Sequence, residues 1–126
     1  LFKKYNIFES VFKNKHDDDQ SLLNLYKCAK CLVYPSSHEG LGLPPLEAMS
    51  LGCPVITSNH EAIIEGVGSA ASIFDPNSID DIRHKIENTI YSDEVINELI
   101  LKGKTQAKNF SWQKCATETY AVYLKI

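Results

Sequence analysis

Short apolar runs alternate with longer amphipathic stretches between residues 10 and 75. The runs are continuously apolar, which is typical of strands that are buried on both faces of a parallel sheet. Strands that alternate with helices in this way predict an α/β fold. We therefore expect part of a Rossmann-like, doubly wound parallel sheet, followed by C-terminal helices. The four expected strands are residues 10–13, 31–35, 54–58 and 70–75.

Helix signals separate and follow these runs. Acidic residues 17–19 can cap a helix, Pro44 and Pro45 suit the first turn of a second, and Gly52 is a usual stop for it. A short helix is expected at residues 61–65. Later helices follow from an isoleucine stripe and from two serine caps. The stripe and the caps are Ile79, Ile82, Ile86, Ile90, Ser92 and Ser111.

Composition excludes several classes of function. The chain has 126 residues, which suits one domain, and a net charge of -3 without a basic cluster, so nucleic acid and anionic membranes are poor partners. No apolar run reaches the roughly 20 residues of a membrane-spanning helix. Without an export signal, we expect a reduced, cytoplasmic setting. Cys28 and Cys31 form a C-x-x-C, but the second cysteine pair of a zinc ribbon is missing, so buried structural cysteines are expected. The histidines are scattered, and no metal site is expected.

The segment PSSHEGLGLPPLEAM has the composition of a ligand-binding loop. It follows an expected strand, and ligands of open parallel sheets bind at the carboxyl ends of the strands. Gly40 and Gly42 would let a phosphate approach backbone N–H groups at a helix N-terminus. Glu39 lies before the glycines, and we expect Glu47 in the first turn of the following helix. Both carboxylates can accept hydrogen bonds from sugar hydroxyls. From chemistry alone, Glu47 could equally be a helix-stabilising charge, and Glu39 a solvated loop residue.

The stretch SSHEGLGLPPLEAMSLGCPVITSN resembles the E-x7-E segment of the retaining glycosyltransferases of family 4. Its flanks agree: LLNLYKCAKCLVYPS resembles the preceding helix and strand, EAIIEGVGSAASIFDP the following region, and FSWQKCATETYAVY the terminal helix. The resemblance covers about residues 11 to 126. It implies the GT-B fold, in which two Rossmann-like domains face each other across a cleft. Residues 1–126 would then form part of the C-terminal, nucleotide-sugar-binding domain.

The resemblance also implies roles for individual residues. Glu39 would contact the donor sugar near its reacting carbon, residues 40–43 would meet the sugar and the diphosphate, and Glu47 would bind the ribose. Lys13 and Asn14 would border the nucleobase. The residues of this loop are Gly40, Leu41, Gly42 and Leu43.

The implied reaction transfers a glycosyl group from a nucleotide-diphosphate sugar to an acceptor, with retention and without a metal or other cofactor. The acceptor, and any peripheral association with a membrane, would depend on an N-terminal domain outside this chain. One alternative stays open, a non-catalytic nucleotide-sugar-binding module. A flavodoxin-like FMN module is disfavoured, because EGLGLPP offers neither a hydroxyl-rich phosphate loop nor stacking aromatics. A nucleotide-sugar epimerase would not be expected to have the F-S-W tail together with E-x7-E.

Two structural expectations follow from reading the chain as part of a domain. The first strands of the sheet would precede residue 1, so the run around Val11 should fray or pair in an unusual place. In the family, the terminal helix packs on the N-terminal domain. Because that domain would lie outside this chain, Tyr120 and Tyr123 should be exposed.

Overall fold

The computed structural model describes residues 10–12 and 18–125 and confirms the expected α/β class. Three strands, β1 (Leu32–Tyr34), β2 (Val55–Ser58) and β3 (Ser72–Phe74), form a parallel sheet in the order β1-β2-β3. Val33 pairs with Ile56, and Thr57 pairs with Ile73. All three strands lie within predicted runs. The central strand β2 is buried at every position, as a strand with neighbours on both sides should be.

Two helices connect the strands and build the core. Helix α2 (Leu43–Ser50) joins β1 to β2, and α3 (Glu61–Val67) with the 3-10 turn η2 (Gly68–Ala70) joins β2 to β3. Both begin close to their predicted starts, and Gly52 lies just past the end of α2 with a positive φ of 80°. Fully buried apolar side chains of the core come from α2, β2, α3 and β3, and they include Ala48, Met49, Val55, Ile63 and Phe74.

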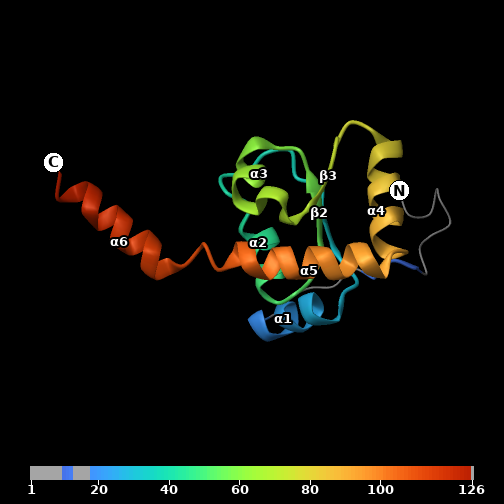
Figure 1. Cartoon of the computed structure of the whole chain (residues 1–126), viewed down its shortest axis with the longest axis horizontal. Coiled ribbons are helices and arrows are strands. Elements are labelled where there is room, and N and C mark those ends of the chain that lie inside the picture. The colour runs from blue at the N-terminus through green and yellow to red at the C-terminus, as the bar shows by residue number, and fades with distance from the viewer. Residues whose placement is uncertain (1–9, 13–17, 126) are drawn as a thin grey trace.

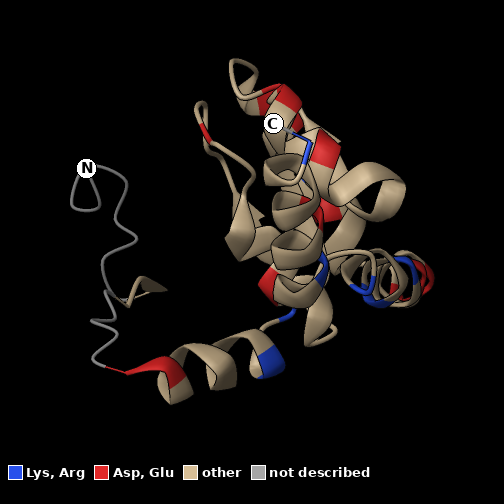
Figure 2. Cartoon of the chain, turned by 90° about the vertical axis from the view of Figure 1, so that its left-hand side faces the viewer, with Lys and Arg blue, Asp and Glu red and all other residues tan. Residues whose placement is uncertain are grey.

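Helix α1 (Asp19–Cys28) precedes β1 and begins at the predicted acidic cap. The Asp18 carboxylate accepts a hydrogen bond from the Ser21 N–H at 2.7 Å. Acidic residues lie at the start of the helix and Lys27 at its end, which complements the helix dipole (Figure 2). Tyr26 is the buried residue of this helix, and it joins α1 to the core.

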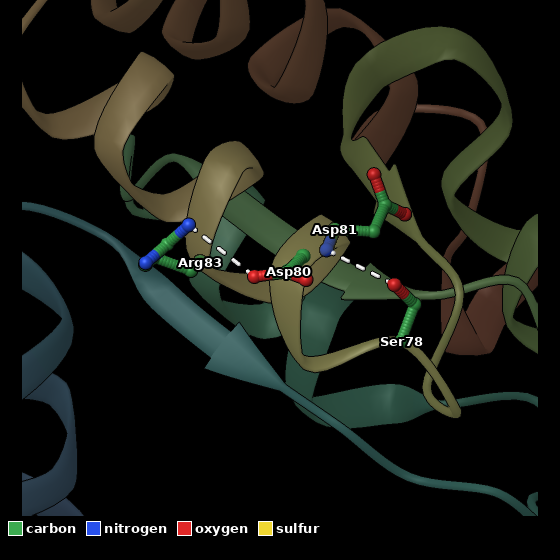
Figure 3. Close-up of polar contacts among 4 residues, drawn as sticks. All are labelled: Ser78, Asp80, Asp81 and Arg83. Carbon is green, nitrogen blue, oxygen red and sulfur yellow. Dashed lines mark hydrogen bonds and ion pairs between the residues drawn. The ribbon is translucent and has the colours of Figure 1, made fainter.

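Helices α4 (Ile79–Ile90) and α5 (Asp93–Ala107) follow β3. The Ser78 hydroxyl caps α4 by accepting from the Asp81 N–H, while Arg83 pairs with Asp80 on the surface (Figure 3). The predicted stripe is only partly buried, because Ile79 is 83% exposed. Helix α5 packs on α2, where Gly103 lies against Met49.

The last helix, α6 (Trp112–Tyr123), extends away from the rest of the molecule (Figure 1). It begins at the predicted cap Ser111, whose hydroxyl accepts from the Lys114 N–H at 3.1 Å. None of its residues is buried. Tyr120 and Tyr123 are 64% and 71% exposed, which confirms the expectation for these tyrosines.

The predicted first strand is wrong where the structure describes it. Ser10 has 3-10 geometry, Val11 and Phe12 belong to no helix or strand, and Phe12 is 91% exposed. An out-of-place pairing of this run is therefore contradicted over residues 10–12. A short apolar run becomes a strand only when another strand satisfies its backbone hydrogen bonds. Lys13 and Asn14 lie outside the described residues.

The expected burial of the C-x-x-C cysteines is also wrong for one of the pair. Cys28 ends α1 and is exposed, whereas Cys31 is partly buried, and burial raises the pKa of its thiol. The reason is the helical phase: the buried face of α1 contains Tyr26, and Cys28 lies two residues further around the helix. In the described part of the chain, no helix is long and apolar enough to cross a membrane.

Candidate functional site

The candidate site lies at the carboxyl edge of the sheet. Because the three strands are parallel, the segments that leave β1, β2 and β3 all begin at this edge. Residues 35–42 form the longest of these segments, and they include Glu39 and the glycine loop.

Glu39 is held by two hydroxyl groups. The Tyr34 hydroxyl donates to Glu39 Oε1 at 2.5 Å, and the Ser36 hydroxyl donates to the same oxygen at 2.8 Å. Both donors favour the ionised carboxylate. They lower the pKa of Glu39, Tyr34 contributing most, with a smaller effect of the nearby His60 and His38. The side chain is therefore a carboxylate of fixed orientation at neutral pH rather than a freely solvated loop residue.

The two glutamates each affect the pKa of a tyrosine, Glu39 that of Tyr34 and Glu47 that of Tyr26. Burial, and then the Glu39 carboxylate, raise the pKa of Tyr34 to about 12, and Tyr26 adds to the shift. Burial, and then the charge of Glu47, raise the pKa of Tyr26. Glu39 thus acts on Tyr34 and Glu47 acts on Tyr26, and Tyr26 has a smaller effect on the pKa of Tyr34.

The helical position of Glu47 differs from the prediction. Helix α2 begins at Leu43, so Glu47 is its fifth residue, and the first turn contains no acidic side chain. The prediction counted from the prolines, but Pro44 and Pro45 are the second and third residues of the helix. A carboxylate in the second turn gains little from the helix N-terminus, so helix stabilisation alone does not account for Glu47.

The loop before α2 presents unpaired backbone donors. The N–H groups of the four residues between Glu39 and Pro44 make no hydrogen bond to any other described residue. Pro44 and Pro45 have no N–H, so the donors at this helix end come from the loop. Such a row of N–H groups suits an anion. The four residues are Gly40, Leu41, Gly42 and Leu43.

The two glycines of the loop differ. A Cβ on Gly40 would meet no atom within 4 Å, so the space beside this backbone is open. Gly42 is buried, has a φ of 75°, and packs against Ile63. Gly42 is therefore needed for the turn into α2 and for the close approach of α3.

An open cavity of about 540 Å³ lies beside the loop, at the end of β2. The His60 ring makes an edge contact with His38, with 5.8 Å between the ring centroids, so the segments after β1 and β2 meet here. His60 also contributes to the lowered pKa of Glu39. The residues that line the cavity are Asn59, His60, Glu61, Ala62 and Glu65. Within residues 10–12 and 18–125, no group of three or more His, Cys, Asp or Glu side chains could hold a metal ion.

Sequence reasoning missed the two tyrosines, Ser36 and the cavity. Tyr34 and Ser36 are two residues apart at the end of a strand, a spacing that puts side chains on one side. That alternation is a signal for a pair of donors, although it does not say which acceptor they reach.

Comparisons with known proteins identify the family of this chain. A family model described as "Glycosyl transferases group 1" matches residues 1–106. The O-antigen chain mannosyltransferase B of Escherichia coli is 44% identical over 105 residues, which cover 83% of this chain and 28% of that protein. The MMP alpha-(1->4)-mannosyltransferase of Mycolicibacterium hassiacum is 31% identical over 129 residues, which cover 99% of this chain and 31% of that protein.

A solved structure supports the fold. Sucrose-phosphate synthase from Thermosynechococcus elongatus superposes with a TM-score of 0.89 at 24% identity, covering 98% of this chain and 32% of that one. The chain therefore spans about a third or less of these proteins. The family model, by contrast, matches most of the chain. The chain belongs to the group 1 glycosyl transferase family.

Proposed function

We propose that this chain forms the donor-binding part of a retaining glycosyltransferase, with the E-x7-E arrangement of family 4. The enzyme transfers a sugar from a nucleotide-diphosphate donor to an acceptor that the rest of the protein binds. The observation that carries the proposal is the juxtaposition of Glu39, fixed in its ionised form, with four unpaired N–H groups directly after it. A carboxylate suits sugar hydroxyls, and a row of N–H groups suits phosphate oxygens.

Each group of the donor then has a partner. Glu39 accepts a hydrogen bond from a hydroxyl of the sugar and lies near the reacting carbon. There it also stabilises the positive charge that develops in the transition state. The N–H groups of residues 40–43 bind the sugar and the diphosphate. Glu47 is exposed and accepts hydrogen bonds from the ribose hydroxyls.

The transferred sugar is proposed to be mannose. The two relatives described above are named as mannosyltransferases, and further mannosyltransferases share 38–39% identity with this chain. The site chemistry is compatible with this choice, because a carboxylate binds hydroxyls of any hexose.

Retention does not require an enzymatic nucleophile in this proposal. The acceptor hydroxyl attacks the anomeric carbon from the face that the diphosphate leaves. Its proton passes to the leaving phosphate oxygen as the carbon–oxygen bond to phosphate breaks. Glu39 stays unmodified throughout, and no metal is needed for the step.

The test uses the full-length protein with nucleotide-diphosphate mannose, and NMR of the product to read the anomeric configuration. Mannose transfer with retention is expected, and Glu39→Gln should lower kcat by about 100-fold or more, as removal of a transition-state contact does. Glu47→Gln should mainly weaken donor binding in calorimetry. Donor binding without any transfer would instead support the non-catalytic binding module. If the protein neither binds nor transfers the sugar of any sugar nucleotide, the proposal is refuted.

A further inference from the structure

The two hydrogen bonds to Glu39 converge on one of its oxygens. Tyr34 and Ser36 both donate to Oε1, and Oε2 accepts no hydrogen bond from a described residue. Ser36 also lies 3.3 Å from the His38 carbonyl. A serine hydroxyl has one proton, and the shorter contact to the charged carboxylate is the stronger one.

Strand β2, next to β1, fixes the backbone of both donor residues, Tyr34 and Ser36. The Thr57 hydroxyl donates to the Tyr34 carbonyl at 3.0 Å, and the Ser58 hydroxyl donates to the Ser36 carbonyl. Thr57 and Ser58 are fully buried in β2. The backbone on both sides of Pro35 is therefore tied to the central strand. Glu39 and Ser36 lie on the loop, but Tyr34 belongs to β1, and the Ser36 backbone is held by the buried Ser58 of β2.

From this geometry we infer that Tyr34 and Ser36 are positioning residues, which occupy Oε1 of Glu39 and leave Oε2 to accept a hydroxyl of the donor sugar. The inference rests on the proposed function for the role of Glu39 toward the sugar. Neither tyrosine nor serine touches the donor. Their part is to select one orientation of the carboxylate and to keep it ionised, so that binding does not have to order a mobile side chain.

A titration tests the inference without any substrate. The carboxyl carbon of Glu39 is followed by NMR as a function of pH, with Glu39→Gln to assign the signal. Tyr34→Phe and Ser36→Ala each remove a donor to the ionised form, so each should raise the pKa of Glu39. Ser36→Thr keeps a hydroxyl and should leave it unchanged. Matched controls are Tyr91→Phe, at an exposed tyrosine just after the end of α4, and Ser37→Ala, next to Ser36.

The same variants are then assayed in the full-length enzyme. Because Glu39 must be ionised to act, the acid limb of the pH profile of kcat/KM should move to higher pH in Tyr34→Phe and in Ser36→Ala. At neutral pH, kcat/KM should fall about tenfold, as expected for one charge-assisted hydrogen bond. Ser36→Thr keeps the hydroxyl, so its acid limb should lie at the same pH as in the unsubstituted enzyme. A merely structural role of Ser36 would not predict this.

The outcomes separate the two proposals. An unchanged pKa of Glu39 in both Tyr34→Phe and Ser36→Ala would overturn the inference, whatever the enzyme does. Ser36 is small and at the edge of the core, so Ser36→Ala keeps the test valid if Tyr34→Phe fails to fold. If Glu39→Gln leaves transfer and donor binding unchanged, the proposed function of Glu39 fails, even where the titration shows both hydrogen bonds.

Discussion

Gly42 is the residue at which the backbone imposes the strictest requirement on this site. Its φ of 75° is a left-handed conformation, and a Cβ there would lie 3.3 Å from Cγ1 of Ile63. An alanine at this position would pay for the left-handed backbone, about 1–2 kcal/mol, and would also push against α3. Gly40, two residues earlier, has open space where its Cβ would be and no positive φ.

Gly42→Ala should therefore lower the free energy of unfolding by about 1–2 kcal/mol in urea denaturation, with an unchanged m-value. Gly40→Ala is the matched control and should change it by less than about 0.5 kcal/mol. The pair isolates the backbone requirement from the ligand-binding role, since both glycines lie in the same loop. Equal destabilisation by the two substitutions would show that the turn into α2 does not depend on the left-handed residue.

At single residues, the sequence predicts what depends on local chemistry. Glu39 and Gly40 could be identified from their neighbours along the chain, and the structure places them at the sheet edge. The partners of Glu39 are less accessible to such reasoning, because which acceptor a tyrosine hydroxyl reaches depends on the path that residues 35–42 take in space. Tyr26 is harder still, since its relation to Glu47 arises from the packing of α1 near α2.

At the scale of elements, two helices share the same cap but differ in what they contact. Ser92 caps α5 and accepts from the Val95 N–H at 3.3 Å, while Ser111 caps α6 and accepts from the Lys114 N–H at 3.1 Å. Helix α5 packs on α2, where Gly103 meets Met49, and its Leu99 is buried. Helix α6 buries nothing.

Ser92→Ala should lower the free energy of unfolding by about 1 kcal/mol, because the lost cap weakens a helix that unfolds together with the core. Ser111→Ala should reduce the helical signal in circular dichroism slightly, but leave the midpoint of the urea transition unchanged. The two substitutions are chemically identical, so any difference comes from the coupling of each helix to the core. A shift of the midpoint by Ser111→Ala equal to that of Ser92→Ala would contradict the independence of α6.

The same distinction explains which elements could be predicted. The serine and aspartate caps are satisfied within three residues, so Asp18, Ser92 and Ser111 could be recognised from the sequence. The strands at β1, β2 and β3 have strongly apolar runs and mutual partners. The run at residues 10–13 has a similar pattern, but a strand requires a neighbour, and its described residues have none within the sheet. Pairing is a non-local property that a four-residue pattern does not contain.

At the scale of the whole molecule, the chain consists of an α/β body and a helix outside it. The segment after α5 leads into α6, which stands apart from the sheet and its helices (Figure 1). A local contact, from Lys114 Nζ to the Asn109 carbonyl at 3.3 Å, ties α6 to this segment. Local opening of an element with so few buried contacts costs much less free energy than opening the core.

The single tryptophan of the chain, Trp112, offers a direct test of this division, because it is the first residue of α6 and is 80% exposed. In the isolated chain, its fluorescence should be that of a solvated indole, strongly quenched by iodide, and should change little across the urea range in which circular dichroism reports the unfolding of the body. Since two probes of a two-state transition must coincide, this mismatch would demonstrate separate unfolding. A protected indole whose signal follows the cooperative transition would instead mean that α6 packs on the body or on another copy.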